Sequence, residues 1–171
     1  MYIDHGFPNN IPSLQGLRML IVDNNIDSGD VMTMLLQPYG VEVRVAFLVQ
    51  QALELFVQWQ PDVLVSEIAL PKEDGYALIR RVRTLTAARG KETLALAVTA
   101  YADKQTGQRA LSAGFDMRFT KPLNFDEFLA ALSCLVISRQ STYAIAQRIL
   151  GNVLRHDESN LENQLCPAVP S

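Results

Sequence analysis

Short apolar runs alternate along the chain with segments of helical periodicity. The runs end abruptly at polar residues, which is typical of strands buried on both faces. We expect strands at residues 18–22, 41–46, 62–66, 93–98 and 116–120. Between them, apolar residues recur at three- and four-residue spacing, which predicts helices that each bury one face. These helices are expected from Asp27 or Ser28, over 52–59, from Tyr76, over 104–113, and from Asn124 or Asp126.

This alternation predicts an α/β fold, because strands separated by helices form parallel sheets through right-handed crossovers. At this size we expect the flavodoxin-like, doubly wound arrangement of five parallel strands, with an extra C-terminal helix. Residues 41–46 alternate around Glu42 and Arg44, so they are expected to form an edge strand. Ligands of such sheets bind at the carboxyl ends of the strands.

Composition divides the chain into four parts. Residues 1–16, rich in Gly, Pro and Asn, are expected to be a flexible leader before an α/β domain over 17–138. Residues 139–155 are expected to form an amphipathic helical extension. The polar residues 156–171 are expected to form a disordered tail. The extension either docks on its own domain, pairs with a second copy, or binds a partner. Its apolar positions are Tyr143, Ala146, Ile149, Leu150, Val153 and Leu154.

Charge and termini change this picture little. Fifteen basic and 18 acidic residues give a formal net charge of -3, so no attraction to nucleic acid or anionic membrane is expected. The arginines at 80, 81 and 83 are interpreted as a solvated helix face. The first residues contain neither the basic segment nor the apolar segment of a signal peptide. No apolar run is interpreted as long enough to span a membrane. We therefore expect a cytoplasmic protein.

Four polar residues stand at the ends of predicted strands: Asp23, Glu67, Thr99 and Lys121. Taken singly, each is explained as a helix cap, a turn hydroxyl or a surface base. The fold nevertheless places them at one edge of the sheet. Carboxylates there bind a hard divalent cation, while a hydroxyl and an ammonium suit a phosphoryl group.

The segments that carry these residues resemble the receiver domain of two-component response regulators. The matching stretches are residues 19–25, 61–71 followed by Asp74-Gly75, 97–100 and 120–122. The resemblance implies a phosphoacceptor position at 67, an acidic cation site at 23 and 24 aided by the Ala69 carbonyl, and a switch hydroxyl on Thr99. It also implies that Lys121 contacts the phosphoryl group and that the Lys121-Pro122 peptide is cis.

Three positions depart from the family pattern. Glu67 replaces the acceptor aspartate, and its extra methylene moves the carboxylate farther into the cleft. Asn24 removes one charge from the cation site. Arg118 stands where family members often carry an aromatic switch residue. It is interpreted as an exposed arginine, and the alternative is that it reaches an acidic partner or the Glu67 region.

These departures favour an atypical receiver, or pseudo-receiver, which acts in phosphorelay signalling by protein–protein interaction. Glu67 then pairs with Lys121, within reach of Thr99, and either mimics an activated state or forms a structural ion pair. The alternative is a phosphorylatable regulator with Mg²⁺ that uses Glu67 or Asp74 as acceptor. An enzyme is not expected, because no glycine-rich phosphate loop follows the first strand.

The resemblance also bounds the cofactors and partners. We expect no cofactor, or weakly bound Mg²⁺ held by Asp23 and Glu67. Expected partners are a histidine kinase or another signalling protein, and a second copy bound through the C-terminal helix. Neither nucleic acid nor a membrane is expected as a partner.

Overall fold

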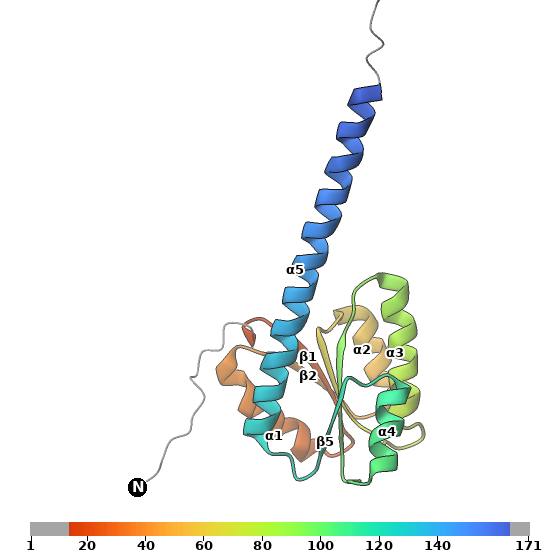
Figure 1. The fold of residues 1–171 in the computed structure, drawn as a ribbon. Helices are drawn as coiled ribbons and strands as arrows, with labels where there is room; N and C mark the ends of the chain where they lie inside the picture. The colour runs from red at the N-terminus through yellow and green to blue at the C-terminus, as the bar shows by residue number, and fades with distance from the viewer. Residues whose placement is uncertain (1–13, 165–171) are drawn as a thin grey trace, which may run out of the picture. The chain divides into compact units, whose positions relative to one another are not determined.

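The computed structural model describes the backbone of residues 14–164 and the side chains of residues 14–150. It divides into two compact units, one through Ser133 and one from Cys134 onward, which are described separately. The helices and strands of the first unit follow one another in strict alternation (Figure 1). They are β1 (Arg18–Val22), α1 (Ile26–Leu36), η2 (Gln37–Tyr39), β2 (Glu42–Ala46), α2 (Val49–Trp59), β3 (Val63–Glu67), α3 (Gly75–Arg89), β4 (Leu94–Thr99), α4 (Lys104–Ala113), β5 (Met117–Thr120) and the start of α5 (Phe125–Gln164).

The five strands form one parallel sheet in the order β2-β1-β3-β4-β5. This order is that of flavodoxin-like folds and confirms the predicted fold class. The central strands β3 and β4 are buried along their whole length, whereas β2 alternates between exposed and part-buried residues, as expected at an edge. Helices α2, α3 and α4 lie on one side of the sheet, and α1 with the first turns of α5 on the other (Figure 1).

Apolar side chains fill both layers between sheet and helices. The larger cluster lies beneath α2, α3 and α4, where Phe56, Trp59 and Ile79 pack against strand residues such as Leu20 and Leu64. On the opposite side, Phe128, Leu129 and Leu132 of α5 are fully buried. Burial of side chains of this size stabilises the fold by about 1.5 to 3 kcal/mol each. The strand ends are therefore carried by a rigid frame.

The boundary of the domain differs from the prediction at its N-terminal side. Leu14 is completely buried, and the Gly16 N–H donates to the Gly40 carbonyl at 2.9 Å. Residues 14–16 thus belong to the packed domain. The Leu14 side chain fixes this segment by its burial, although the nearby Gly16 is typical of a flexible turn. The rest of the expected leader, residues 1–13, lies outside the described residues.

Helix α5 is longer than expected, since it runs without interruption from Phe125 to Gln164. The predicted domain boundary between residues 138 and 139 falls inside this helix, and residues 156–164, which were predicted to belong to a disordered tail, are helical. No proline lies within α5, and the single Gly151 costs about 1 kcal/mol, which does not end a helix. Residues 165–171 of the expected tail lie outside the described residues.

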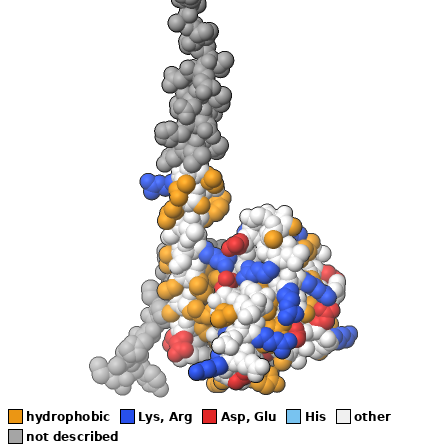
Figure 2. Space-filling model, turned by 45° about the vertical axis from the view of Figure 1, so that its right-hand side comes forward, with side chains coloured by type: hydrophobic (Ala, Val, Ile, Leu, Met, Phe, Trp, Pro, Cys, Tyr) orange, Lys and Arg blue, Asp and Glu red, His pale blue; other side chains and the backbone are white. Residues whose placement is uncertain are grey.

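The second unit exposes apolar side chains along α5 (Figure 2). Those with described side chains are Ile137, Tyr143, Ile145, Ile149 and Leu150. By length and composition, Phe125–Leu150 also passes as a candidate membrane span, with 22% of its most apolar window buried. The interpretation that no run is long enough was therefore wrong, because it did not join the two helical segments.

Candidate functional site

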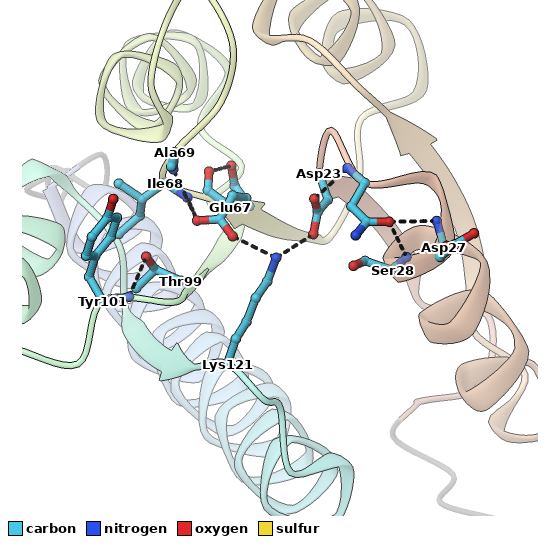
Figure 3. Close-up of polar contacts among 11 residues, drawn as sticks. Asp23, Asp27, Ser28, Glu67, Ile68, Ala69, Thr99, Tyr101 and Lys121 are labelled. Carbon is cyan, nitrogen blue, oxygen red and sulfur yellow. Dashed lines mark hydrogen bonds and ion pairs between the residues drawn. The ribbon is translucent and has the colours of Figure 1, made fainter.

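The carboxyl ends of the strands bring the predicted polar residues together. Asp23 follows β1, Glu67 ends β3, Thr99 ends β4 and Lys121 follows β5. Parallel register aligns these ends, since Val22 pairs with Ser66, Glu67 with Val98 and Thr99 with Thr120. In Figure 3, Lys121 extends between Asp23 and Glu67 from the opposite side of the cleft.

Lys121 bridges the two carboxylates. Its Nζ atom lies 2.7 Å from Glu67 Oε2 and 3.0 Å from Asp23 Oδ2. Asp23 and Glu67 are almost completely buried, and the lysine side chain is about one third exposed. The ion pair expected between Glu67 and Lys121 is thus present, and Asp23 shares it.

The pKa of Lys121 reports the balance of forces in this cluster. Burial lowers the pKa of the ammonium, because desolvation disfavours the charged form. Hydrogen bonds and charges of Glu67 and then Asp23 outweigh burial, so the pKa of Lys121 lies above its usual 10.5. The lysine is therefore a cation at every physiological pH.

The remaining carboxylate oxygens are also engaged. Glu67 Oε1 accepts hydrogen bonds from the backbone N–H groups of Ile68 at 2.8 Å and Ala69 at 3.1 Å. Asp23 Oδ1 accepts the Asn25 N–H at 2.9 Å. Each of the four oxygens consequently has a protein partner. The longer side chain of Glu67 lets its carboxylate reach the lysine and fold back onto its own loop.

The loop after Glu67 is held tightly against β3. The Gly75 N–H donates to the Ile68 carbonyl at 2.8 Å, and a Cβ at Gly75 would lie 2.5 Å from the Glu67 carbonyl oxygen. A larger residue at 75 would push the loop away from the site. Asp74, the alternative acceptor, caps α3. Its Oδ1 accepts the Ala77 N–H at 2.9 Å, and this hydrogen bond stabilises the start of the helix.

The first helix begins differently from the prediction. Asn25, and not Asp27 or Ser28, is the cap of α1, because its Oδ1 accepts the N–H groups of those two residues. The sequence signal was present, since asparagine directly before a helical stretch is a preferred cap. Asn24, the expected partner of Asp23 in a cation site, is exposed.

The donor set fits a resident Mg²⁺ poorly. Asp23 and Glu67 are its only carboxylates, and both already bind the Lys121 ammonium. Asn24 is neutral and exposed, so it adds no negative charge to the set. Among the described residues, no group of three or more Asp, Glu, His or Cys side chains is placed to hold a metal. A divalent cation would have to displace the lysine.

Thr99 and Arg118 organise the loop between β4 and α4. The Thr99 hydroxyl is fully buried and accepts the Tyr101 N–H at 3.3 Å, and no hydrogen bond joins it to Glu67. Arg118 Nη1 donates to the Tyr101 carbonyl at 2.8 Å and to the Asp103 carbonyl at 3.2 Å. Of the alternatives left open for Arg118, the structure shows neither a contact with Glu67 nor full exposure: the side chain is part-buried and binds carbonyls of the loop before α4.

A glycine makes room for this arginine. A Cβ on Gly107 would lie 3.1 Å from the Arg118 guanidinium, which therefore lies flat against the first turns of α4. Asp103, the cap of α4, has a lowered pKa, chiefly through hydrogen bonds from Thr106 and to a lesser extent through the charge of Arg118. Arg118 thus braces the loop where family members often carry an aromatic residue.

One arginine of the supposed solvated face is also a structural brace. Arg83 donates to the carbonyls of Gly114 and Thr93 and pairs with Asp116 at 2.8 Å. Arg80 and Arg81 are exposed, and Arg81 pairs with Glu73 at 3.1 Å. The run is therefore no continuous basic surface, which agrees with the expectation of no nucleic acid but does not test it.

Fold and site together define a class: a doubly wound domain with acids and a lysine at the carboxyl ends of its strands. Residues 19–133 match the family model of the response regulator receiver domain, and the chain belongs to that family. Receiver domains are signalling modules of two-component systems, which interact with histidine kinases and other signalling proteins. The Lys121-Pro122 bond is cis, as the resemblance implied.

Individual relatives agree with this assignment. An uncharacterized 14.6 kDa protein of Leptolyngbya boryana is 38% identical over 66% of this chain and 84% of its own length. The transcriptional regulatory protein DltR of Streptococcus agalactiae is 31% identical over 86% of this chain, which spans 64% of DltR. A CheY-like receiver domain protein of Methanospirillum hungatei shares the fold, with a TM-score of 0.67, 24% identity, and coverage of 74% and 98% of the two chains.

Proposed function

We propose that this chain is a pseudo-receiver that acts in phosphorelay signalling through protein–protein interaction, with Glu67 in place of the phosphoacceptor. The observation that carries the proposal is the Lys121 ammonium, which lies 2.7 Å from Glu67 and 3.0 Å from Asp23. By resemblance, this lysine would be the charge partner of a phosphoryl group. Here it neutralises carboxylates of the protein itself.

The same geometry disfavours phosphoryl transfer to Glu67. Attack on phosphorus needs a carboxylate oxygen free and in line, with a cation fixed beside it. Glu67 Oε1 accepts two backbone N–H groups and Oε2 is held by the lysine, so attack would first break this arrangement. Misplacement of a reacting group by 1 Å costs about 100-fold in rate. Capping of α3 by Asp74 counts against the other acceptor.

We further propose that the domain presents one fixed state to its partner. The cluster at the strand ends pairs the Lys121 ammonium with the Glu67 and Asp23 carboxylates, so no phosphoryl group is needed to bind the lysine. At the neighbouring loop, Arg118 binds the carbonyls of Tyr101 and Asp103, so the start of α4 is braced independently of any phosphoryl group. This favours the activated-state mimic over an ion pair with no further role.

The partner is proposed to be a histidine kinase or another signalling protein, with no catalytic activity in the chain itself. The exposed apolar residues of α5 are proposed to pair with a second copy, and not to enter a membrane or bind nucleic acid. Arg139 lies near the middle of the candidate span, and an arginine at the bilayer centre costs about 2.5 to 3.5 kcal/mol. A cytoplasmic location and a signalling domain over 17–138, extended to Leu14, complete the proposal.

Phosphorylation is tested with the full chain, a small-molecule acyl phosphate donor and Mg²⁺, followed by intact mass spectrometry. We expect no phosphoryl adduct on the native chain. Glu67→Asp is the matched comparison, because it restores the shorter acceptor and keeps the charge. A native adduct that disappears in Glu67→Ala would establish the phosphorylatable alternative and refute the proposal.

The interaction is tested by comparing proteins captured by the native chain, Glu67→Ala and Glu67→Gln. Both variants remove the Glu67 charge and leave that of Asp23, and glutamine keeps the size of the side chain. Loss of the same partner in both supports a signalling role for the ion pair. If the folded variants capture the same proteins as the native chain, the Glu67–Lys121 ion pair has a structural role only.

A further inference from the structure

A cavity of about 380 Å³ lies between α1 and the connection from β5 to α5, next to the ion-pair cluster. Its size is within the range of small-molecule sites, which are about 300 to 1,000 Å³. Neither the family resemblance nor the proposed function requires such a cavity. All of its lining residues belong to the first unit.

Most of the lining is apolar. Val31, Met32 and Leu35 project from α1, Leu123 and Phe125 lie on the opposite wall, and strand residues form the floor. Val31 and Leu35 remain 52% and 37% exposed, although valine and leucine usually contribute to cores. A ligand that covers them gains the free energy of burying apolar surface, about 25 cal/mol per Å².

Charge is concentrated at one end of this cavity. The lining includes three carboxylates, those of Asp23, Asp27 and Glu67, and one ammonium, that of Lys121, which leaves a surplus of two negative charges. Lys121 already binds Asp23 and Glu67. The Asp27 carboxylate makes no hydrogen bond or ion pair with any residue that the structure describes. In Figure 3, Asp27 and Ser28 lie on the first turn of α1, farther from Lys121 than Asp23 is.

We propose that this cavity binds a small molecule with an apolar ring system or short chain and a single cationic group. The apolar part lies between α1 and Leu123–Phe125, and the cation faces Asp27 and the neighbouring acids. A neutral ligand would leave the surplus charge unmatched, and an anion would be repelled. The inference goes beyond the proposed function, and it requires neither a protein partner nor phosphorylation.

Three naphthalene probes of similar shape test, on the full chain, whether the cavity prefers a cation to a neutral molecule or an anion. They are 1-naphthylmethylammonium, 1-naphthylmethanol and 1-naphthoate. Titrations are followed by backbone amide NMR. A probe of this size is expected to bind with a Kd of about 2 mM. We expect the ammonium probe to bind about fivefold more tightly than the alcohol, since one charge contact near a surface contributes about 1 kcal/mol or more, and the acid to bind most weakly.

Substitutions on α1 locate the site. Val31→Trp fills the cavity from a half-exposed position, and we expect it to abolish binding of the ammonium probe. Met34→Trp is the matched control, because Met34 is on the same helix, is 68% exposed and does not line the cavity. Asp27→Asn halves the surplus negative charge, so it should reduce the affinity for the ammonium probe toward that for the alcohol and leave the affinity for the alcohol unchanged.

The outcomes are decisive in both directions. Amide shifts confined to α1 and residues 122–125, with the expected order of probes and loss in Val31→Trp alone, support the site. Equal affinity for all three probes, shifts elsewhere, no measurable binding, or binding that survives Val31→Trp would each overturn it. No partner or phosphodonor is present in these titrations, so their failure would leave the proposed function standing.

Discussion

Replacing Lys121 with methionine tests the central cluster most directly. Methionine keeps most of the length and apolar volume of the lysine stem and removes the ammonium. Asp23 and Glu67, both almost completely buried and both within 3.0 Å of the lost nitrogen, would then face each other without a cation. Two buried like charges destabilise the folded chain, because neither is compensated.

The cost follows from the exposure of the groups. Breaking a fully buried ion pair costs about 3 to 5 kcal/mol, whereas an exposed pair contributes about 0 to 1 kcal/mol. The carboxylates are 8% and 9% exposed but the lysine is 31% exposed, which lets water screen part of the interaction. We therefore expect Lys121→Met to lower the free energy of unfolding by about 2 to 3 kcal/mol at pH 7.

Urea denaturation at pH 7, followed by circular dichroism, measures this loss. Lys91→Met is the matched control, since Lys91 also binds a carboxylate, that of Asp62, at 2.9 Å. That pair is 55% and 34% exposed, so its removal should cost less than about 1 kcal/mol. A loss in Lys121→Met no larger than in the control would refute the account of the cluster as a buried, lysine-centred unit.

The pH dependence supplies a second, independent check. The pKa of Lys121 is raised in the folded state, so its contribution is fully present below the unfolded value of 10.5 and is lost as pH rises through the folded value. The stability difference between the native chain and Lys121→Met should therefore be constant from pH 7 to pH 9 and shrink as pH rises above 10.5. A difference that does not shrink in that alkaline range would contradict the account of a lysine-centred cluster.

Three further outcomes are expected. Asn25→Ala removes the cap of α1 and should cost about 1 kcal/mol in urea denaturation, with Asn24→Ala, at an exposed position, as the near-neutral control. Arg118→Met should accelerate amide hydrogen exchange in the loop around Tyr101 and Asp103 and leave the β1 amides unchanged; equal protection would exclude the brace. Leu150→Glu should shift the chain from dimer to monomer in light scattering if α5 pairs with a second copy, and a monomeric native chain would remove that proposal.

The sheet could be predicted from the sequence because its signals are local and mutually consistent. Each strand is a short apolar run with a polar residue at its end, and parallel strands gather their carboxyl ends at one edge. Asp23, Glu67, Thr99 and Lys121 could therefore be placed in one site before any geometry was known. The choice between helix caps could not be made in the same way, since Asn25, Asp27 and Ser28 are all good caps.

Long side chains were the least predictable part of the site. Arg118 and Arg83 each choose among several carbonyls that only the folded chain brings near, at sequence separations of up to 31 residues. Their positions in a sequence reveal the charge and not the acceptor. Likewise, apolar residues near 14 and 156–164 gave weak periodic signals, because a single buried leucine and the end of a long helix do not repeat a pattern.

At position 67, the residue type alone did not predict the contacts that the side chain makes. From the sequence, the added methylene counts only as misplacement of an acceptor. In the structure, the same length lets one carboxylate oxygen accept two backbone N–H groups while the other binds Lys121. Aspartate at this position, being shorter, could not be expected to satisfy both sets of partners at once. Glu67 therefore joins the end of β3 to Lys121, which follows β5, and to the backbone of its own loop.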